Sequence, residues 1–236
     1  MRLKAQGMLV PGGLSADFAD EYRRIKRPLL ANAYGKSSVL VDRGNLILVT
    51  SSVPNEGKTF STVNLALSLA QEVDHMVLLI DGDLVKRSAT RVFDLGGVPG
   101  FADVLNGDVS LSSAIWGCDI PNLFVLPAGS THQNITEMFA SRKMVELADT
   151  LAKRDQNRIV IIDSPPLLAT PQTPVLINLI GQVAMVVAAG ETPMSVVKDA
   201  LELIPREKSI GLILNKVSDI LRRQPNQYYG YYGYGD

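Results

Sequence analysis

The 236-residue chain has little of several features that define whole classes of protein. Its single cysteine, Cys118, excludes an intrachain disulfide framework and any intrachain zinc or iron–sulfur site built on several cysteines. No apolar run approaches the ~18–20 residues that cross a bilayer. The basic start MRLKAQGMLVPGG lacks the ~7–15-residue apolar stretch of a signal peptide. We therefore expect a cytoplasmic protein without a membrane span.

The net charge and the positions of the histidines argue against two common kinds of partner, nucleic acids and metal ions. The formal net charge is −1, so no overall field attracts nucleic acid or an anionic membrane. The two histidines, His75 and His132, stand far apart in the sequence, which favours surface or loop positions over metal ligation. We expect no nucleic-acid partner.

Short apolar segments do alternate with longer amphipathic ones through residues 44–216. Near-continuous apolar strands joined by helices are typical of a parallel sheet covered on both faces. The pattern therefore predicts an α/β fold with a doubly wound, mostly parallel sheet, and one of its helices is expected over residues 136–153. The expected strands are residues 45–51, 76–81, 122–129, 158–163, 182–190 and 210–215.

Two segments lie outside this alternation, although we expect one domain over residues 1–236. Residues 15–34 predict a charged helix, with Ser15 or Asp17 as its N-cap and Pro28 as a kink or restart. Residues 217–236 lose apolar periodicity and end in QYYGYYGYGD. Glycine between the tyrosines disfavours regular structure, which predicts a flexible, tyrosine-rich tail.

The first expected strand runs into SSVPNEGKTF, which fits the phosphate-binding pattern G-x-x-x-x-G-K-[ST] except that Ser52 replaces the first glycine. In this pattern Gly57 permits close backbone approach, Lys58 reaches the β- and γ-phosphates, and the Thr59 hydroxyl binds Mg²⁺. The helix that follows directs its free N–H groups at the phosphates. The expected ATP-binding residues are Ser52, Val53, Pro54, Asn55, Glu56, Gly57, Lys58, Thr59 and Phe60.

Aspartates end two further strands. MVLLIDGD places Asp81 and Asp83 after one strand, and RIVIIDSPP places Asp163 after another. Ligands of a doubly wound sheet gather at the carboxyl ends of its strands, so these carboxylates are expected beside the phosphate loop, with Thr59, Asp81 and Asp163 as Mg²⁺ ligands. Asn215 ends the last expected strand, where an adenine contact and a plain turn are equally good interpretations.

Together these segments resemble the bacterial tyrosine autokinases, or BY-kinases, of capsule and exopolysaccharide export. The similarity is greatest to the free-standing type of exosortase-linked loci. SSVPNEGKTF resembles the family's Walker A box, VLLIDGD its A′ box, IVIIDSPP its Walker B box, and the tail its tyrosine cluster. EYRRIKR resembles its E-x2-R-x2-R oligomerisation motif through Glu21, Arg24 and Arg27.

The resemblance implies a partitioning-ATPase-like P-loop domain that uses ATP and Mg²⁺ to phosphorylate tyrosines between subunits of a ring. It implies Lys58, Asp81 and Asp83 as catalytic residues, with Asp81 orienting the acceptor hydroxyl. It also implies that a membrane-bound polysaccharide co-polymerase activates the chain and recruits it to the plasma membrane. The implied phosphoacceptors are Tyr228, Tyr229, Tyr231, Tyr232 and Tyr234.

Two departures from the family pattern leave alternatives open. Asn55 occupies a loop position often held by glycine, and Val85 intervenes before the basic residues Lys86 and Arg87 that follow the A′ aspartates. A regulatory scaffold that binds ATP without turnover is favoured if the Val85 departure disables catalysis. The other alternative is a partitioning or positioning ATPase, but those proteins carry a lysine where this chain has Val53.

Overall fold

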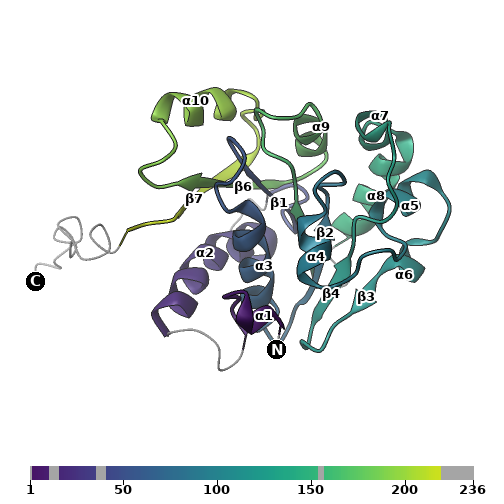
Figure 1. Cartoon of the computed structure of the whole chain (residues 1–236), viewed down its shortest axis with the longest axis horizontal. Helices are drawn as coiled ribbons and strands as arrows, with labels where there is room; N and C mark the ends of the chain where they lie inside the picture. Colours follow the sequence, from purple (N-terminus) through teal and green to yellow (C-terminus); the bar gives the residue numbers. More distant parts are fainter. Residues whose placement is uncertain (1, 11–15, 36–40, 154–156, 219–236) are drawn as a thin grey trace, which may run out of the picture.

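The computed structural model describes residues 2–10, 16–35, 41–153 and 157–218. Over these residues the chain forms a seven-stranded sheet of order β3-β4-β2-β5-β1-β6-β7 (Figure 1). All neighbouring strands are parallel except β3 and β4, so the predicted mostly parallel α/β sheet is confirmed. The strands are β1 Leu46–Ser51, β2 Met76–Asp81, β3 Trp116–Gly117, β4 Leu123–Leu126, β5 Arg158–Asp163, β6 Gln182–Ala188 and β7 Ser209–Asn215.

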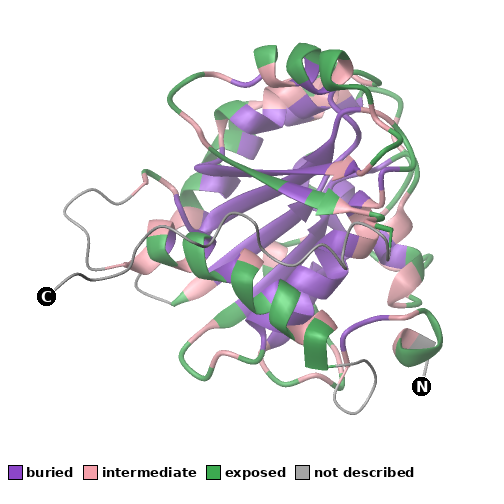
Figure 2. Ribbon diagram, turned by 90° about the vertical axis from the view of Figure 1, so that its left-hand side faces the viewer, coloured by how far each residue is buried: buried purple, intermediate pink, exposed green. Residues whose placement is uncertain are grey.

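Helices cover both faces of the sheet because successive strand residues point to opposite faces. In β1, Leu46 and Leu48 join one core, while Ile47 and Val49 join the other. Figure 2 shows the buried strands enclosed between the two helical layers. The helices are α1 Arg2–Ala5, α2 Ala16–Tyr34, α3 Lys58–Leu69, α4 Ser88–Val92, α5 Phe101–Asn106, α6 Leu111–Ala114, α7 Ile135–Phe139, α8 Arg142–Ala152, α9 Gln172–Asn178 and α10 Met194–Glu202.

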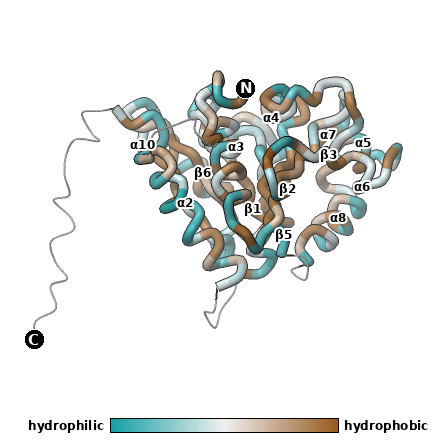
Figure 3. Tube along the Cα trace, turned by 90° about the horizontal axis from the view of Figure 1, so that it is seen from below, coloured by the Kyte–Doolittle hydropathy of each residue, from teal (hydrophilic) through white to brown (hydrophobic). Residues whose placement is uncertain are grey.

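Different helices cover the two faces of the sheet. Buried residues of α2 and α3 form the core on one face, and those of α5, α7, α8, α9 and α10 form the core on the other. In Figure 3 apolar segments concentrate along the strands, and polar segments occupy outer helical surfaces such as that of α2. None of the helices in the described part of the chain combines the length and apolarity needed to span a membrane.

The prediction of one helix over residues 136–153 is wrong. The chain forms α7 and α8 instead, and Ser141 caps α8 by accepting a hydrogen bond from the Met144 N–H at 3.2 Å. Val145 recurs at near-helical spacing with the apolar residues of this segment, yet it is 38% exposed. The two-residue strand β3 was not predicted, because Trp116 and Gly117 are both exposed and too few to show alternation.

Helix α2 runs without a break through Pro28, so the expected restart does not occur. Proline has no N–H to pair with the carbonyl one turn earlier, but tertiary packing of α2 on α3 compensates for this loss. The buried residues of α2 are Tyr22, Lys26, Leu29 and Ala33, at the spacing of one helix face. Lys26 donates a hydrogen bond to the Ser68 carbonyl at 2.7 Å and pairs with Glu72, which ties α2 to the end of α3. Of the two predicted N-caps, Asp17 lies within the helix, and Ser15 lies outside the described residues.

Candidate active site

The site lies at the carboxyl ends of three adjacent central strands. Asp163 is in register with Val49 of β1 on one side and with Asp81 of β2 on the other. The phosphate loop, residues 52–57, leaves β1 two residues after Val49 and leads into α3. The parallel sheet therefore brings the two predicted aspartate motifs and the loop to one edge, as expected for a doubly wound fold.

The conformation of the loop accounts for its departures from the usual glycine pattern. Asn55 has φ 69°, in the left-handed region that glycine favours and that asparagine tolerates better than most other residues. Ser52 does not have a positive φ, so a side chain is tolerated at this position. Gly57 has φ 89°, and a Cβ there would lie 2.0 Å from Nδ2 of Asn215. The backbone thus requires glycine at 57 but not at 52 or 55.

The carboxylate of Glu56, a residue of the predicted ATP-binding loop, is engaged in hydrogen bonds within the protein. It is 2% exposed and accepts hydrogen bonds from the Val53 N–H (2.8 Å), the Ala188 N–H (3.2 Å) and the Thr192 hydroxyl (2.5 Å). Asn215 donates from Nδ2 to the Glu56 carbonyl at 2.8 Å. Glu56 and Asn215 therefore clamp the loop to the ends of β6 and β7.

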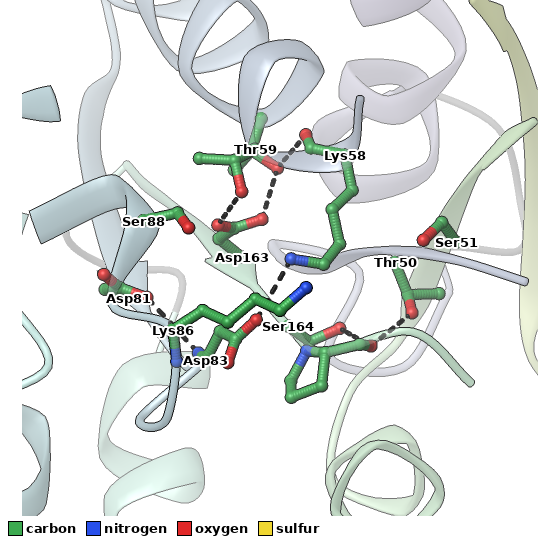
Figure 4. Close-up of polar contacts among 12 residues, drawn as sticks. Thr50, Ser51, Lys58, Thr59, Asp81, Asp83, Lys86, Ser88, Asp163 and Ser164 are labelled. Carbon is green, nitrogen blue, oxygen red and sulfur yellow. Dashed lines mark hydrogen bonds and ion pairs between the residues drawn. The ribbon is translucent and has the colours of Figure 1, made fainter. Parts of the chain in front are cut away.

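Lys58 and Thr59 each contact a buried carboxylate (Figure 4). Nζ of Lys58 lies 3.2 Å from Oδ2 of Asp83, and the Thr59 hydroxyl donates to Oδ2 of Asp163 at 2.7 Å. Thr62, one helical turn further along α3, donates to Oδ1 of Asp163 at 3.1 Å. The sequence interpretation missed Thr62, although its position three residues after Thr59 on a helix places both hydroxyls on one side.

Asp81 is held by α4. Its Oδ2 accepts hydrogen bonds from both the N–H and the hydroxyl of Thr90, each at 2.7 Å, and the carboxyl is fully buried. Burial, together with the charges of Asp163 and Asp83, raises the pKa of Asp81 to about 7. Thr90 is nine residues away with no motif around it, so no signal in the sequence identified it.

The donor set fits a magnesium–phosphate ligand. The three carboxylates of Asp81, Asp83 and Asp163 are at most 2% exposed, and the ammonium group of Lys58 contacts that of Asp83. Ionised, they place a net charge of about −2 in a buried site, which a divalent cation compensates. Burial also raises the pKa of Asp163 despite Lys58 and two threonine donors. Such a cost of ionising Asp163 is expected at a site where a bound cation would stabilise the carboxylate.

The two basic residues after the A′ aspartates point in different directions. Lys86 is exposed, and its side chain extends beside Asp83 in the close-up (Figure 4). Arg87 donates from Nε to the Leu84 carbonyl at 3.1 Å and lines a separate hollow with Pro99 and Asp103. Lys86 is therefore the better placed cation for a ligand at Asp83.

A histidine and two carboxylates come together at Asp103, which the sequence interpretation did not anticipate. Ligand atoms of Asp103, Asp108 and His132 lie within 4.8 Å of one another. Asp103, however, already accepts from the Gly100 N–H at 2.7 Å and the Ser130 N–H at 3.1 Å, which fixes the local loop. We assign no ion to this group.

The predicted oligomerisation residues form an exposed row on α2. Glu21, Arg24 and Arg27 are all exposed, while Tyr22 between them is buried against α3. The hydroxyl of Tyr22 interacts with Ser61 and Asn64 of α3, and burial raises the pKa of this phenol to about 12. The same helix thus presents the motif outward and contacts the helix of the phosphate loop inward.

Comparison with curated proteins identifies tyrosine kinases. The chain is 33% identical over 193 residues to the tyrosine-protein kinase YwqD of Bacillus subtilis, covering 80% of this chain and 78% of YwqD. It is 33% identical over 177 residues to the tyrosine-protein kinase Ptk of Acinetobacter johnsonii, covering 74% of this chain. The chain spans only 24% of the length of Ptk. No protein-family model matches the chain.

Solved structures agree with these relatives. The kinase domain of the Escherichia coli tyrosine kinase Etk superposes with a TM-score of 0.75 at 25% identity, covering 92% of this chain and 80% of that one. The septum-site-determining protein MinD of Pyrococcus horikoshii, solved with Mg-ADP, is a more distant match. Its TM-score is 0.59 at 26% identity, covering 72% of this chain and 69% of MinD.

Proposed function

Because the chain belongs to the bacterial tyrosine-protein kinase family, we propose that it transfers the γ-phosphoryl group of ATP to tyrosines of its own C-terminal cluster. The observation that supports this most is the buried group of Lys58, Asp83 and Asp163 at the strand ends beside the loop. Phosphoryl transfer requires positioning and charge neutralisation more than covalent chemistry, and this group offers both.

Each residue has a distinct role in the proposal. Lys58 and the loop N–H groups would hold the transferring phosphoryl group, and the Thr59 hydroxyl and Asp163 would hold Mg²⁺. The ion would neutralise charge that develops on the phosphate oxygens. As the tyrosine oxygen bonds to the γ-phosphorus, the bond to the bridging oxygen breaks and ADP leaves. Asp81 orients the tyrosine hydroxyl and accepts its proton late, with Asp83 in support.

Burial of Asp81 makes this proton transfer easier than the ordinary pKa of an aspartate suggests. An ordinary aspartate has a pKa about six units below that of tyrosine, ~10. With the pKa of Asp81 at about 7, the gap is about three units. Burial therefore makes Asp81 a better proton acceptor than an ordinary aspartate.

The acceptors are expected outside the described residues. Of the chain's seven tyrosines, Tyr22 is 5% exposed, and the hydroxyl of Tyr34 donates to the Arg158 carbonyl at 2.7 Å. Neither hydroxyl is available to a second subunit. The remaining five, Tyr228, Tyr229, Tyr231, Tyr232 and Tyr234, lie in residues 219–236, outside the described residues.

Assembly and partners complete the proposal. The exposed row of Glu21, Arg24 and Arg27 is suited to contact a second copy, which supports a ring of unphosphorylated subunits that phosphorylate one another. A membrane-bound polysaccharide co-polymerase would recruit this ring to the membrane and activate it, and the ring would regulate exopolysaccharide polymerisation and export. Phosphates on the tails would repel one another and dissociate the ring.

Incubation with ATP and Mg²⁺ tests the proposal. We expect phosphotyrosine on the purified chain, located by mass spectrometry. Release of ADP and phosphate without phosphotyrosine would instead support the positioning-ATPase function, which the likeness to MinD keeps as the second candidate. ATP binding without turnover would support the regulatory scaffold.

A further inference from the structure

A buried hydroxyl group behind the site holds one side of Asp81. Thr90 of α4 is 4% exposed, and Asp81, at the end of β2, is fully buried. The N–H and the hydroxyl of Thr90 both donate to Oδ2 of Asp81, each at 2.7 Å. The Thr90 oxygen in turn accepts a hydrogen bond from the Ala128 N–H at 2.9 Å. One oxygen of the carboxylate is thus fixed by two short hydrogen bonds.

The direction of these hydrogen bonds follows from the groups that make them. A backbone N–H can only donate, so the Thr90 oxygen has to be the acceptor for Ala128. The single hydroxyl proton of Thr90 is then left for Asp81. Ala128 is itself held, because its carbonyl accepts from the Ala102 N–H of α5 at 3.0 Å. The Thr90 hydroxyl therefore has one orientation, and it points at Oδ2.

The local sequence explains why α4 engages Asp81. The first N–H groups of a helix have no partner within the helix, and the side chain of the residue before it normally accepts from one of them. The residue in that place, Arg87, has no side-chain oxygen and makes no such hydrogen bond. Asp81 supplies the missing acceptor to Thr90, the third residue of α4. The strand-end aspartate therefore caps the helix that follows it.

The two oxygens of Asp81 consequently differ. Oδ2 is occupied by the two donors of Thr90. Among the described residues, Oδ1 accepts one longer hydrogen bond, from the Asp83 N–H at 3.3 Å. A carboxylate oxygen has two lone pairs, so Oδ1 keeps one of them for a ligand.

The other two carboxylates of the site contact a different helix. Nζ of Lys58 pairs with Asp83, and the hydroxyl of Thr59 donates to Asp163 (Figure 4). Both partners belong to α3, which follows the phosphate loop. Because Asp81 is held by α4 instead, its orientation can be changed without removing the α3 contacts of the phosphate site.

We propose that Thr90 is a positioning residue for phosphoryl transfer, which holds Oδ2 of Asp81 so that Oδ1 receives the tyrosine hydroxyl. This inference rests on the proposed function. In the transfer, the tyrosine oxygen bonds to the γ-phosphorus, the bond to the bridging oxygen breaks and ADP leaves. The hydroxyl proton passes to Oδ1. Without the Thr90 hydroxyl, the carboxylate can rotate about its Cβ–Cγ bond, and small misplacements of a reacting group cost up to about 100-fold in rate.

The rate of phosphotyrosine formation on the full-length chain, measured against ATP concentration, tests the proposal. Thr90→Val keeps the shape of the side chain but removes the hydroxyl. We expect its kcat to fall about 10- to 100-fold, while the KM for ATP and the Kd for Mg-ADP stay within about twofold of the wild type. Thr90→Ser keeps the hydroxyl and should recover kcat to within about threefold of the wild type.

Two further variants separate positioning from folding. Asn45 is buried just before β1, at the end of the sheet opposite to the site, and donates to the Leu151 carbonyl at 3.1 Å. Asn45→Ala should therefore lower the midpoint of urea unfolding, as Thr90→Val does, yet keep kcat. Thr90→Ala removes the hydroxyl without placing a methyl group against the Ala128 N–H. It takes the place of Thr90→Val if valine prevents folding.

The possible results distinguish this inference from the proposed function. A wild-type kcat in the variant without the hydroxyl would overturn the inference and leave the proposed function intact. So would a rise in the KM for ATP with kcat unchanged, or a Thr90→Ser variant as slow as Thr90→Val. A wild-type chain that consumes ATP without forming phosphotyrosine would overturn the proposed function, and the inference with it.

Discussion

The ammonium of Lys58 lies 3.2 Å from the carboxylate of Asp83, with both side chains at most 10% exposed. The lysine thus pairs with a protein carboxylate, and a bound phosphate would compete with it for the same ammonium group. Nucleotide binding has to exchange this ion pair for contacts with phosphate oxygens. Asp83 therefore competes with the ligand for Lys58 until Mg²⁺ neutralises the carboxylates.

Asp83→Asn should separate nucleotide binding from catalysis. The amide keeps the acceptor for the Lys86 N–H, which lies 3.0 Å from Oδ1, but removes the charge that holds Lys58. We expect affinity for ADP without Mg²⁺ to rise about three- to tenfold, or roughly 0.7–1.4 kcal/mol. Phosphotyrosine formation with Mg²⁺ should fall. Calorimetric titration that shows weaker metal-free binding would contradict the competition.

Glu56→Ala should loosen the phosphate loop, although Glu56 itself need not touch the nucleotide. The substitution leaves the Val53 and Ala188 N–H groups and the Thr192 hydroxyl without their acceptor. We expect a loss of about 1–3 kcal/mol of unfolding free energy and weaker ATP binding. Glu137→Ala, at an exposed glutamate of α7, is the control and should unfold like the wild type in urea. Equal stability of the two variants would show that the clamp is unimportant.

Motif contiguity explains which parts of this site could be predicted. Lys58, Thr59, Asp81 and Asp163 lie within short patterns, and the parallel sheet brings the ends of their strands together without further information. The clamp on Glu56 was not predictable, because its partner Thr192 is 136 residues away and belongs to no motif. The role of Thr90 was likewise set by packing, whereas Thr62 follows Thr59 at helical spacing and was open to prediction.

Local patterns were also insufficient where the fold depends on tertiary contacts. The apolar spacing of residues 136–153 continues across Ser141, yet Ser141 starts a new helix there. Conversely, Pro28 predicted a kink or restart, but packing of Tyr22 and Leu29 keeps α2 in one piece. In both cases the core geometry determined the result.

Asp81→Asn should change the pH dependence of stability of the ligand-free protein. The pKa of Asp81 is raised from 3.8 to about 7, so its contribution to stability is fully present below pH 3.8 and is lost as pH rises through about 7. Asparagine stays neutral, so the variant should be more stable than the wild type at pH 8. At pH 5 this difference in stability should be smaller. The full shift corresponds to at most about 4 kcal/mol.

Thermal unfolding at pH 5 and pH 8 measures this difference. Each kcal/mol raises the midpoint by about 2–4 °C in a domain of this size. Asp199→Asn, at an exposed carboxylate of α10, is the control. A variant less stable than the wild type at pH 8 would contradict the destabilising effect of the buried charge.

A triple change of Glu21, Arg24 and Arg27 to Ala should yield a monomer. These side chains are exposed, and the packing of Tyr22 and Lys26 on α3 is untouched, so the fold and ATP binding should persist. Sedimentation should show an oligomer for the wild type and for the control Arg23→Ala on the same helix, and a monomer for the triple variant. Its autophosphorylation should be slow. An unchanged mass would show that assembly uses another surface.

Phosphate transfer between two inactive variants tests the central claim most directly. Lys58→Met should abolish catalysis but keep the acceptor tail. Lys58 stabilises the charge on the transferring phosphoryl group and is not part of the hydrophobic core. The variant with Tyr228, Tyr229, Tyr231, Tyr232 and Tyr234 changed to Phe should keep catalysis but lack acceptors. On mixing with ATP and Mg²⁺, we predict phosphotyrosine on the Lys58→Met chains alone, within residues 228–234. No transfer, or phosphate at Tyr22 or Tyr34, would contradict the account.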